Sequence, residues 1–375
     1  MSEADPARLQ SLATGSLAVI RAGQSPSGAY IASPTFPNYQ YSWFRDGAFI
    51  ADAMSRAGEI ASAEAFFGWC ARVLEARTTR VDHLIDRASH GEDVAVTEHL
   101  HTRYTLAGEE SDAAWWNFQL DGYGAWLWAL GAHQRRHGRS VEPFLAGAIV
   151  SARYIEAFWR EPSYDWWEEH RDHRHVSTLA AVAAGLRAAA RLPGVDPSPG
   201  SRFEATATAI LGAVREDATR LGYLPKWLGG DAIDASLLAV ATPFELFEPD
   251  DGTVLATVAR IELELVHAGG VHRYLDDTYY GGGEWLLLAG FLGLHHVAIG
   301  RYDDARSELA WMADHATPDG LFPEQVGDHL LAPGYRAEWE ERWGPIATPL
   351  LWSHAMYVSL AERLGILAPL VGSGR

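Results

Sequence analysis

The sequence predicts an all-α fold in which six helical hairpins close into a ring with an inner and an outer layer. Apolar residues recur at spacings of three and four in long stretches rich in Ala and Leu, a period typical of helices. Alternation typical of strands is confined to short pieces such as 28–33 and 223–227. Short and long connections alternate along the chain, which predicts that the helices pair.

Twelve stretches carry the helical pattern. They are predicted near residues 7–23, 46–57, 59–76, 118–136, 141–160, 176–191, 201–220, 233–241, 252–267, 284–299, 302–315 and 349–365. Gly58-Glu59 joins the second helix to the third, and Gly300-Arg301 joins the tenth to the eleventh. Connections this short place consecutive helices side by side as hairpins.

Other connections are long and rich in aromatic and charged residues. They span 77–117, 161–175, 268–283 and 316–348. Connections of this length are usually functional or disordered, and their Trp, Tyr and Arg content argues against disorder. Because mostly longer connections precede the even-numbered helices, we expect them to meet at the N-termini of the inner layer. Helix N-termini carry free N–H groups and partial positive charge, which suits a polar ligand.

Composition narrows the class of ligand. The 375 residues include 49 acidic and 30 basic side chains, a net charge of −19, which disfavours nucleic acid and anionic membranes as partners. Trp (15) outnumbers Phe (13), and aromatic planes are surfaces on which neutral sugars stack. The single cysteine, Cys70, rules out an intramolecular disulfide and a cysteine-based zinc site.

The first residues of the chain indicate the cellular compartment in which the protein is expected. The segment MSEADPARLQSLATG is polar and lacks the apolar core of a secretory signal. No window holds about 18 consecutive apolar residues, so nothing in the sequence predicts a membrane span. We therefore expect a cytoplasmic protein.

The first candidate site segment is YQYSWFRDG at 39–47, where the second predicted helix begins. An Arg45–Asp46 pair at a helix start can be a surface ion pair with a capping carboxylate. Its aromatic setting, with Tyr39 and Trp43, favours a sugar clamp instead. The charged groups would hold adjacent hydroxyls while the rings cover the apolar face of the sugar.

The second segment is WWNFQLDGYG at 115–124, which enters the fourth predicted helix. Gly122 and Gly124 allow the backbones of two helices to approach closely. The segment is equally consistent with a packing turn and with a site.

The third segment is YDWWEEH at 164–170. It places Glu168 and Glu169 beside two tryptophans, and a carboxyl held against an indole is desolvated. Desolvation raises its pKa, which suits a general acid that stays protonated near neutral pH. His170, His173 and His175 match no zinc template, so we expect a solvated loop face there and no metal.

The last two segments precede the tenth and twelfth predicted helices. RYLDDTYYGGGEW at 273–285 contains a glycine run without the Lys-Ser/Thr signature of a phosphate loop. We expect the glycines to leave space for a ligand beside Arg273 and Trp285. LFPEQV at 321–326 carries Glu324, which on its own resembles an ordinary loop carboxylate.

Taken in order, the segments resemble glycoside hydrolase family 15, the family of glucoamylases, glucodextranases and related α-glucosidases. The matching strings are YQYSWFRDGAF, WWNFQLDGYG, YDWWEEH, RYLDDTYYGGGEW, LFPEQ and PLLWSHAMY, and the resemblance covers about residues 28 to 365. It implies an (α/α)6 barrel that removes a terminal α-glucosyl residue with inversion and releases β-glucose.

The resemblance also implies roles for residues. Glu168 matches the general acid and Glu324 the general base, while Arg45 and Asp46 match residues that grip hydroxyls of the non-reducing glucose. Further positions that line the family's pocket are Tyr39, Trp43, Trp115, Trp167, Glu169, Arg273 and Trp285. An inverting hydrolase needs its carboxyls roughly 6.5–9.5 Å apart. The predicted ring places Glu168 and Glu324 on opposite sides of the barrel mouth.

Family members often carry an N-terminal β-sandwich or a starch-binding module, and the sequence shows neither. We expect a single catalytic domain over 1–375, without cofactor or metal, that acts on short neutral oligosaccharides. A compact member of the family resembles isomaltose-type glucohydrolases, so we expect a preference for α-1,6-linked over α-1,4-linked glucose.

Three alternatives remain. A trehalase of the same family would use the same acid and base, and only a substrate panel separates it. A non-catalytic sugar-sensing barrel is disfavoured because both Glu168 and Glu324 are present. An (α/α)6 epimerase or lyase usually relies on His bases or a Tyr/Arg set, so the ordered segments that carry Glu fit this alternative less well.

Overall fold

The computed structural model describes residues 5–111 and 114–367. Over these residues it contains thirteen α-helices, six short 3-10 helices and six two-residue strands. The strand-like pieces at 28–33 and 223–227 form only isolated bridges, Gln24 with Tyr30 and His175 with Trp227. No helix in the described part of the chain is both long and apolar enough to cross a bilayer.

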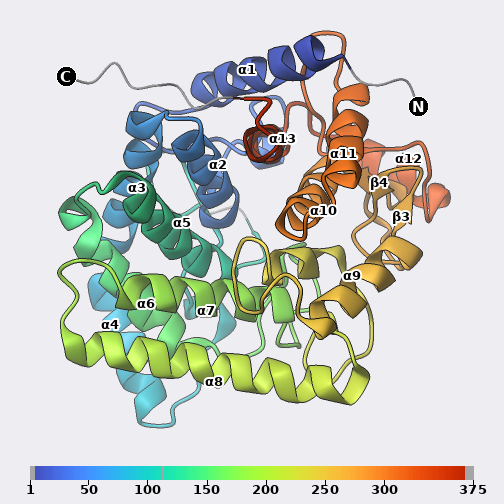
Figure 1. The fold of residues 1–375 in the computed structure, drawn as a ribbon. Coiled ribbons are helices and arrows are strands. Elements are labelled where there is room, and N and C mark those ends of the chain that lie inside the picture. Colours follow the sequence, from blue (N-terminus) through green and yellow to red (C-terminus); the bar gives the residue numbers. More distant parts are fainter. Residues whose placement is uncertain (1–4, 112–113, 368–375) are drawn as a thin grey trace.

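Helical elements alternate between an outer and an inner layer (Figure 1). The inner ring consists of α2 (Phe44–Arg56), α5 (Asp121–His137), α7 (Val176–Ala190), η4 (Ala235–Val240), α10 (Leu286–Ala298) and α13 (Leu351–Arg363). Each inner element packs against the next, and α13 packs against α2, which closes the ring. The outer layer consists of α1 (Pro6–Ala22), α3 (Ile60–Glu75), α6 (Leu145–Phe158), α8 (Pro197–Leu221), α9 (Gly252–Glu264) and α11 (Tyr302–Asp314). The predicted ring of hairpins, an (α/α)6 barrel, is confirmed.

The eighth predicted helix is a correction. The segment predicted at 233–241 forms the short 3-10 element η4 and not an α-helix. The Asp234 side chain accepts a hydrogen bond from Ser236 N and starts the element. Pro243 follows shortly and cannot continue a helix, since it has no N–H to donate. The inner ring keeps this position although the element is short.

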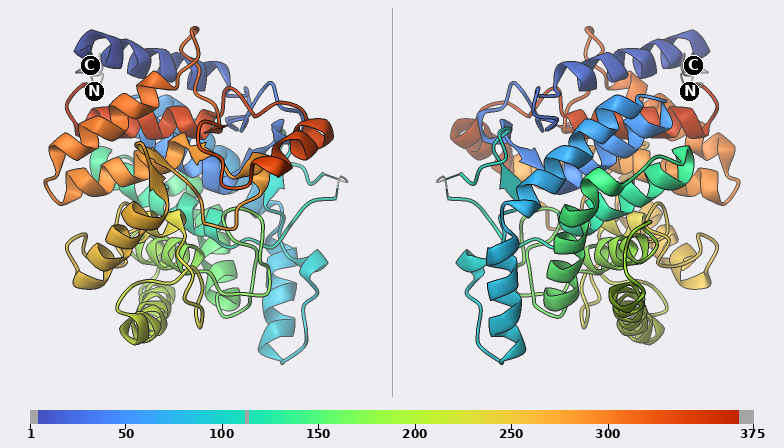
Figure 2. Two further views of the ribbon diagram at one scale, coloured as in Figure 1. Left: turned by 90° about the vertical axis from the view of Figure 1, so that its right-hand side faces the viewer. Right: turned by 90° about the vertical axis from the view of Figure 1, so that its left-hand side faces the viewer.

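Eleven of the twelve predicted helices form, and two helices in connections were missed, so the described residues contain thirteen α-helices. α4 (Thr78–Ser89) lies in the segment 77–117 and projects from the barrel (Figure 2). α12 (Arg336–Trp343) lies in 316–348. α4 is mostly polar and buries only Val81 and Leu84, and α12 buries no residue fully, so neither contains the Ala- and Leu-rich stretch from which the other helices were predicted.

Three antiparallel strand pairs join the loops in front of the inner helices. They are β1 (Ser42–Trp43) with β2 (Arg103–Tyr104), β3 (Val266–His267) with β4 (Gly270–Val271), and β5 (Glu284–Trp285) with β6 (Gln325–Val326). β1 leads directly into α2, and β5 leads directly into α10. The loops that bear the candidate residues are therefore tied to one another by backbone hydrogen bonds.

Aromatic rings fill the barrel axis. Phe49 of α2 stacks on Trp352 of α13 with ring centroids 5.2 Å apart, and it meets Phe291 of α10 edge-on at 5.2 Å. Trp166 packs against Phe49 at 5.8 Å. Trp166 and Trp352 also line the pocket described below, so this core is its floor.

Glycine sets the approach of two inner helices. A Cβ on Gly124 of α5 would lie 2.3 Å from the carbonyl oxygen of Ala181 in α7, and one on Gly185 would lie 2.5 Å from the carbonyl oxygen of Gly124. The predicted close approach at Gly124 is thus confirmed. The backbones cannot move apart without disturbing the ring.

We expect Gly124→Ala to destabilise the fold by roughly 2–3 kcal/mol, because the added methyl meets backbone and not a flexible side chain. Gly212→Ala in α8 is the matched control, since nothing lies within 4 Å of its Cβ position. That change should stabilise by up to about 1 kcal/mol through helix propensity. Chemical denaturation of both variants measures the difference, and equal effects would contradict the packing argument.

Candidate active site

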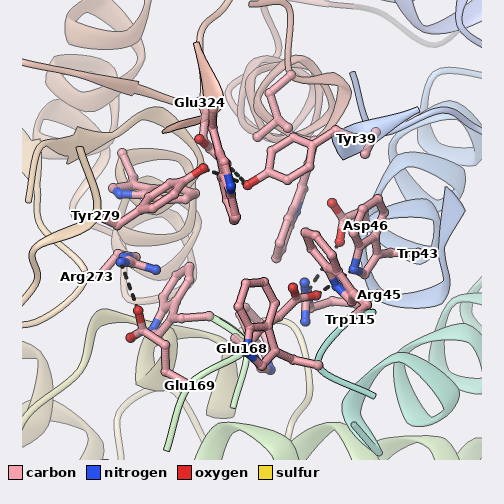
Figure 3. A pocket seen from close by; sticks show the side chains of 18 of the residues that line it. Tyr39, Trp43, Arg45, Asp46, Trp115, Glu168, Glu169, Arg273, Tyr279 and Glu324 are labelled. Atoms are coloured by element: carbon pink, nitrogen blue, oxygen red, sulfur yellow. Dashed lines mark hydrogen bonds and ion pairs between the residues drawn. The ribbon is translucent and has the colours of Figure 1, made fainter. Parts of the chain in front are cut away.

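A single pocket collects all eleven residues that the sequence predicts for the site (Figure 3). It lies among the loops that precede the inner helices and encloses about 770 Å³, including its open mouth. The predicted residues that line it are Tyr39, Trp43, Arg45, Asp46, Trp115, Trp167, Glu168, Glu169, Arg273, Trp285 and Glu324.

Arg45 and Asp46 lie in the first turn of α2. Arg45 Nη1 donates to Gln119 Oε1 at 2.8 Å and to Asp121 Oδ2 at 3.1 Å, which fixes the guanidinium. Arg45 Nε lies 3.4 Å from Asp46 Oδ2, and neither atom has a hydrogen-bond partner among the described residues. Burial raises the pKa of Asp46 to about 6, although Arg45 opposes the shift. One donor and one acceptor therefore remain free for a polar ligand.

Glu168 lies on a tight turn before α7, where its φ is +66°. Asp165 Oδ1 accepts hydrogen bonds from the backbone N–H groups of Trp167 and Glu169, which holds the turn. Trp43 Nε1 donates to Glu168 Oε1 at 2.7 Å. Burial raises the pKa of Glu168 to about 7, with Arg45 and the Trp43 hydrogen bond opposing the shift. This carboxyl can hold a proton near neutral pH.

Glu324 lies across the pocket from Glu168, immediately before β6 (Figure 3). The Tyr39 hydroxyl donates to Glu324 Oε1 at 3.0 Å and is itself 2.9 Å from the Tyr279 hydroxyl. Glu324 Oε2 is buried and finds no hydrogen-bond partner in the described part of the chain. Burial raises the pKa of Glu324 to about 8, with the Tyr39 hydrogen bond and the charge of Arg273 opposing the shift.

We expect kcat/KM to follow a bell-shaped pH profile with both limbs above the ordinary range of glutamate. Burial raises the pKa of Glu168 to about 7 and that of Glu324 to about 8, and the limbs report the pair, because the active state is the fraction of the singly protonated form that carries its proton on Glu168 and leaves Glu324 ionised. Activity falls at low pH, where both carboxyls are protonated, and at high pH, where both are ionised. Rates at low substrate concentration across pH test this, and a maximum below about pH 5 would contradict it.

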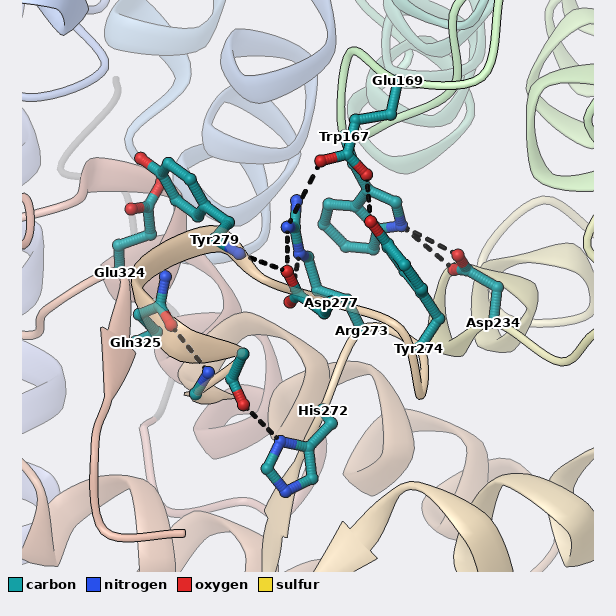
Figure 4. A network of polar contacts seen from close by, with 12 residues as sticks. Trp167, Glu169, Asp234, His272, Arg273, Tyr274, Asp277, Tyr279, Glu324 and Gln325 are labelled. Carbon is teal, nitrogen blue, oxygen red and sulfur yellow. Dashed lines mark hydrogen bonds and ion pairs between the residues drawn. The ribbon is translucent and has the colours of Figure 1, made fainter. Parts of the chain in front are cut away.

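A polar network supports the wall opposite Arg45 (Figure 4). Glu169 accepts a hydrogen bond from the Tyr274 hydroxyl, and its Oε1 lies 3.7 Å from Arg273 Nη2. Arg273 Nε donates to Asp277 Oδ2 at 2.7 Å. The Arg273 guanidinium also lies 5.1 Å from the ring centroid of Trp285. These contacts hold the guanidinium at the pocket edge.

Trp167 is fixed separately. Its Nε1 donates to Asp234 Oδ2 at 2.9 Å, and Lys226 Nζ lies 3.0 Å from the same oxygen. The indole packs against Trp285 with centroids 5.4 Å apart. The two rings form an apolar surface beside the charged groups.

The comparison with protein families identifies the chain. Residues 6–292 match the model of "Glycosyl hydrolases family 15". The chain belongs to glycosyl hydrolase family 15. It is therefore a glycoside hydrolase.

Individual relatives of family 15 cover nearly the whole chain. An isomaltose glucohydrolase of Kribbella flavida is 47% identical over 365 residues, which are 97% of this chain and 95% of that protein. A solved glycosidase variant in complex with glucose is 45% identical, with a TM-score of 0.95 over 98% of this chain and 100% of that one. The glucoamylase from Saccharomycopsis fibuligera shares the fold at 15% identity, with a TM-score of 0.75 over 98% of this chain and 97% of that one.

Sequence reasoning missed several aromatic residues of this family 15 pocket. Trp339 and Trp343 of α12 reach its mouth, where Trp343 stacks on Trp115 with centroids 6.1 Å apart. Tyr279 lines the pocket beside Tyr39. The signal for α12 was two tryptophans four residues apart in the long segment before the last helix. The signal for Tyr279 was its place within the 273–285 segment.

Proposed function

We propose that this protein is an exo-acting, inverting α-glucoside hydrolase that releases β-glucose from isomaltose and similar short α-1,6-linked glucosides. The observation that carries the proposal is a pair of carboxyls on opposite sides of one pocket, Glu168, which is half-buried, and Glu324, which is buried. Each has a different fixed partner, Trp43 for Glu168 and Tyr39 for Glu324. Carboxyls that flank a sugar site from two sides are the machinery of glycoside hydrolysis.

Binding of the terminal glucose would use charged side chains on two sides of the pocket. Arg45 Nε and Asp46 Oδ2 would hold adjacent hydroxyls at one edge of the sugar, and Arg273 with Glu169 would hold the other edge. The floor of Trp166 and Trp352 closes the bottom of the pocket. A closed bottom admits only a chain end, which accounts for the exo mode.

The bond-breaking step then follows from the two carboxyls. Glu168 gives its proton to the glycosidic oxygen as the bond from that oxygen to the anomeric carbon breaks. A water attacks the anomeric carbon from the opposite face, and Glu324 takes a proton from it. Tyr39 occupies Glu324 Oε1, so Oε2 is the oxygen that accepts this proton. Attack from the opposite face converts the α-linkage into β-glucose.

The aromatic mouth supports a short substrate. Trp115, Trp339 and Trp343 narrow the space beyond the terminal glucose, where the leaving sugar would stack. One stacked ring suits a disaccharide better than a branched polymer. The 47% identity to an isomaltose glucohydrolase favours the α-1,6 linkage over α-1,4 and over trehalose.

We expect kcat/KM for isomaltose to exceed that for maltose by about 10-fold or more, with trehalose not cleaved. Glucose release from the three disaccharides, measured with the same enzyme preparation, tests the preference. Preference for trehalose would make this a trehalase of the family, and cleavage of none of the three disaccharides would favour a sugar-binding protein.

Trp343→Ala should raise KM for isomaltose several-fold, because it removes a stacking surface for the leaving sugar.

A further inference from the structure

Three metal-ligating side chains meet outside the catalytic pocket. His267 ends β3, Glu284 begins β5, and His329 follows β6. One ligand atom from each lies within 4.8 Å of the other two. His329 Nδ1 is 3.0 Å from Glu284 Oε1, and the rings of His267 and His329 are 4.0 Å apart between centroids. None of the three lines the catalytic pocket.

Glu284 is the unusual member of the group. Its side chain is 1% exposed, and its Oε2 has no hydrogen-bond partner within the described chain. A Cβ on Gly270 would lie 2.4 Å from the carboxyl carbon of Glu284. Only glycine at position 270 therefore leaves room for this carboxyl. A buried carboxylate oxygen without a partner costs free energy, and a cation would remove that cost.

We propose that His267, Glu284 and His329 bind one divalent transition-metal ion of the zinc class. Two imidazoles and one carboxylate are a ligand set that zinc accepts, whereas magnesium and calcium prefer oxygen ligands. Tetrahedral zinc holds its ligand atoms roughly 3.4 Å apart, which small side-chain rotations reach from the present spacing. The two histidines are exposed, so the fourth position is open to water.

The site is coupled to the catalytic base through the strand pair. Glu284 pairs with Val326, and Trp285 pairs with Gln325, the residue after Glu324. Successive side chains of a strand point to opposite faces, so Trp285 faces the pocket while Glu284 faces the metal site. The ion would tie the β3–β4 hairpin to the segment after Glu324. It acts as a positioning element and takes no part in the reaction.

A second candidate group, Asp165, Glu169 and His170, does not qualify. Lys226 Nζ lies 3.4 Å from Asp165, and Arg273 lies 3.7 Å from Glu169, so cations of the protein already balance the charge of both carboxylates. The proposal departs from the expectation of no metal, which rested on the histidines at 170–175. The members of the new site are far apart in the sequence and match no spacing template.

The test is isothermal titration of the tag-free full chain with zinc chloride at neutral pH. We expect one equivalent to bind, with the affinity falling about 10-fold or more in His267→Ala and in His329→Ala. His90→Ala is the matched control, because His90 is an exposed histidine at the end of α4 and should leave binding unchanged. Saturating zinc should also raise Tm by roughly 3 °C in the wild type and in the control only.

A spectroscopic measurement checks the ligands directly. Cobalt(II) bound in place of zinc should show visible absorption typical of a low-coordinate site, and Glu284→Gln should weaken or abolish it. Unchanged zinc affinity in all three ligand variants, or no stoichiometric binding by the wild type, would overturn the proposal. Thermal unfolding of each variant without metal checks that the substitutions leave the fold intact.

Discussion

Replacing Glu168 with Gln is expected to lower kcat for isomaltose by about 10³-fold or more, the size of a general-acid contribution. The amide keeps the shape of the protonated carboxyl and can still accept from Trp43 Nε1. It cannot deliver a proton to the glycosidic oxygen. The leaving sugar would have to depart as an unprotonated alkoxide, so bond breaking becomes the slow step.

A substrate with a better leaving group separates this role from a binding role. α-Glucosyl fluoride needs little help from a proton donor, so Glu168→Gln should hydrolyse it within about 10-fold of the wild-type rate. Isomaltose turnover close to wild type in the purified variant would contradict the assignment. Equal losses on both substrates would assign Glu168 to binding or to pocket shape.

Glu324→Gln should lose about 10³-fold in kcat on isomaltose and on α-glucosyl fluoride alike. Both substrates need a water activated on the face opposite the leaving group, and the amide cannot take its proton. The Tyr39 hydrogen bond to the side-chain oxygen can persist, so the water remains placed but is not activated. Retained fluoride hydrolysis in this variant would contradict the role of Glu324 as base.

Two controls make these losses interpretable. Burial raises the pKa of both carboxyls, so each is held partly in the neutral form that Gln imitates. The two variants should therefore keep the Tm of the wild type. Glu338→Gln is the matched surface change, since Glu338 is exposed on α12 near the pocket mouth, and its activity should be normal.

The residues that line the pocket could be predicted from the sequence because their signals are local. The spacing of apolar residues predicts the long Ala- and Leu-rich helices. The loops before the inner helices carry Trp, Arg and Glu in short strings. The structure brings Tyr39 and Arg273, far apart in the chain, into the same pocket as the sequence predicts. Ring closure makes these loops neighbours, whatever their distance along the chain.

Other features depended on contacts that no local pattern records. α12 buries no residue fully, and its helical pattern is limited to Trp339 and Trp343, four residues apart, which is too short to predict a helix. η4 keeps an inner-ring position with only six residues. His267, Glu284 and His329 lie close together because of the registers of the β3–β4 and β5–β6 pairs. Strands of two residues are too short for these registers to be predicted from the sequence.

The most direct test of the central claim is proton NMR of the anomeric signals while the purified protein hydrolyses isomaltose. An inverting enzyme built around Glu168 and Glu324 releases β-glucose first, and the α-signal grows only later as the sugar mutarotates. If α-glucose accumulates first, the enzyme retains configuration, and Glu324 cannot be a base that activates water.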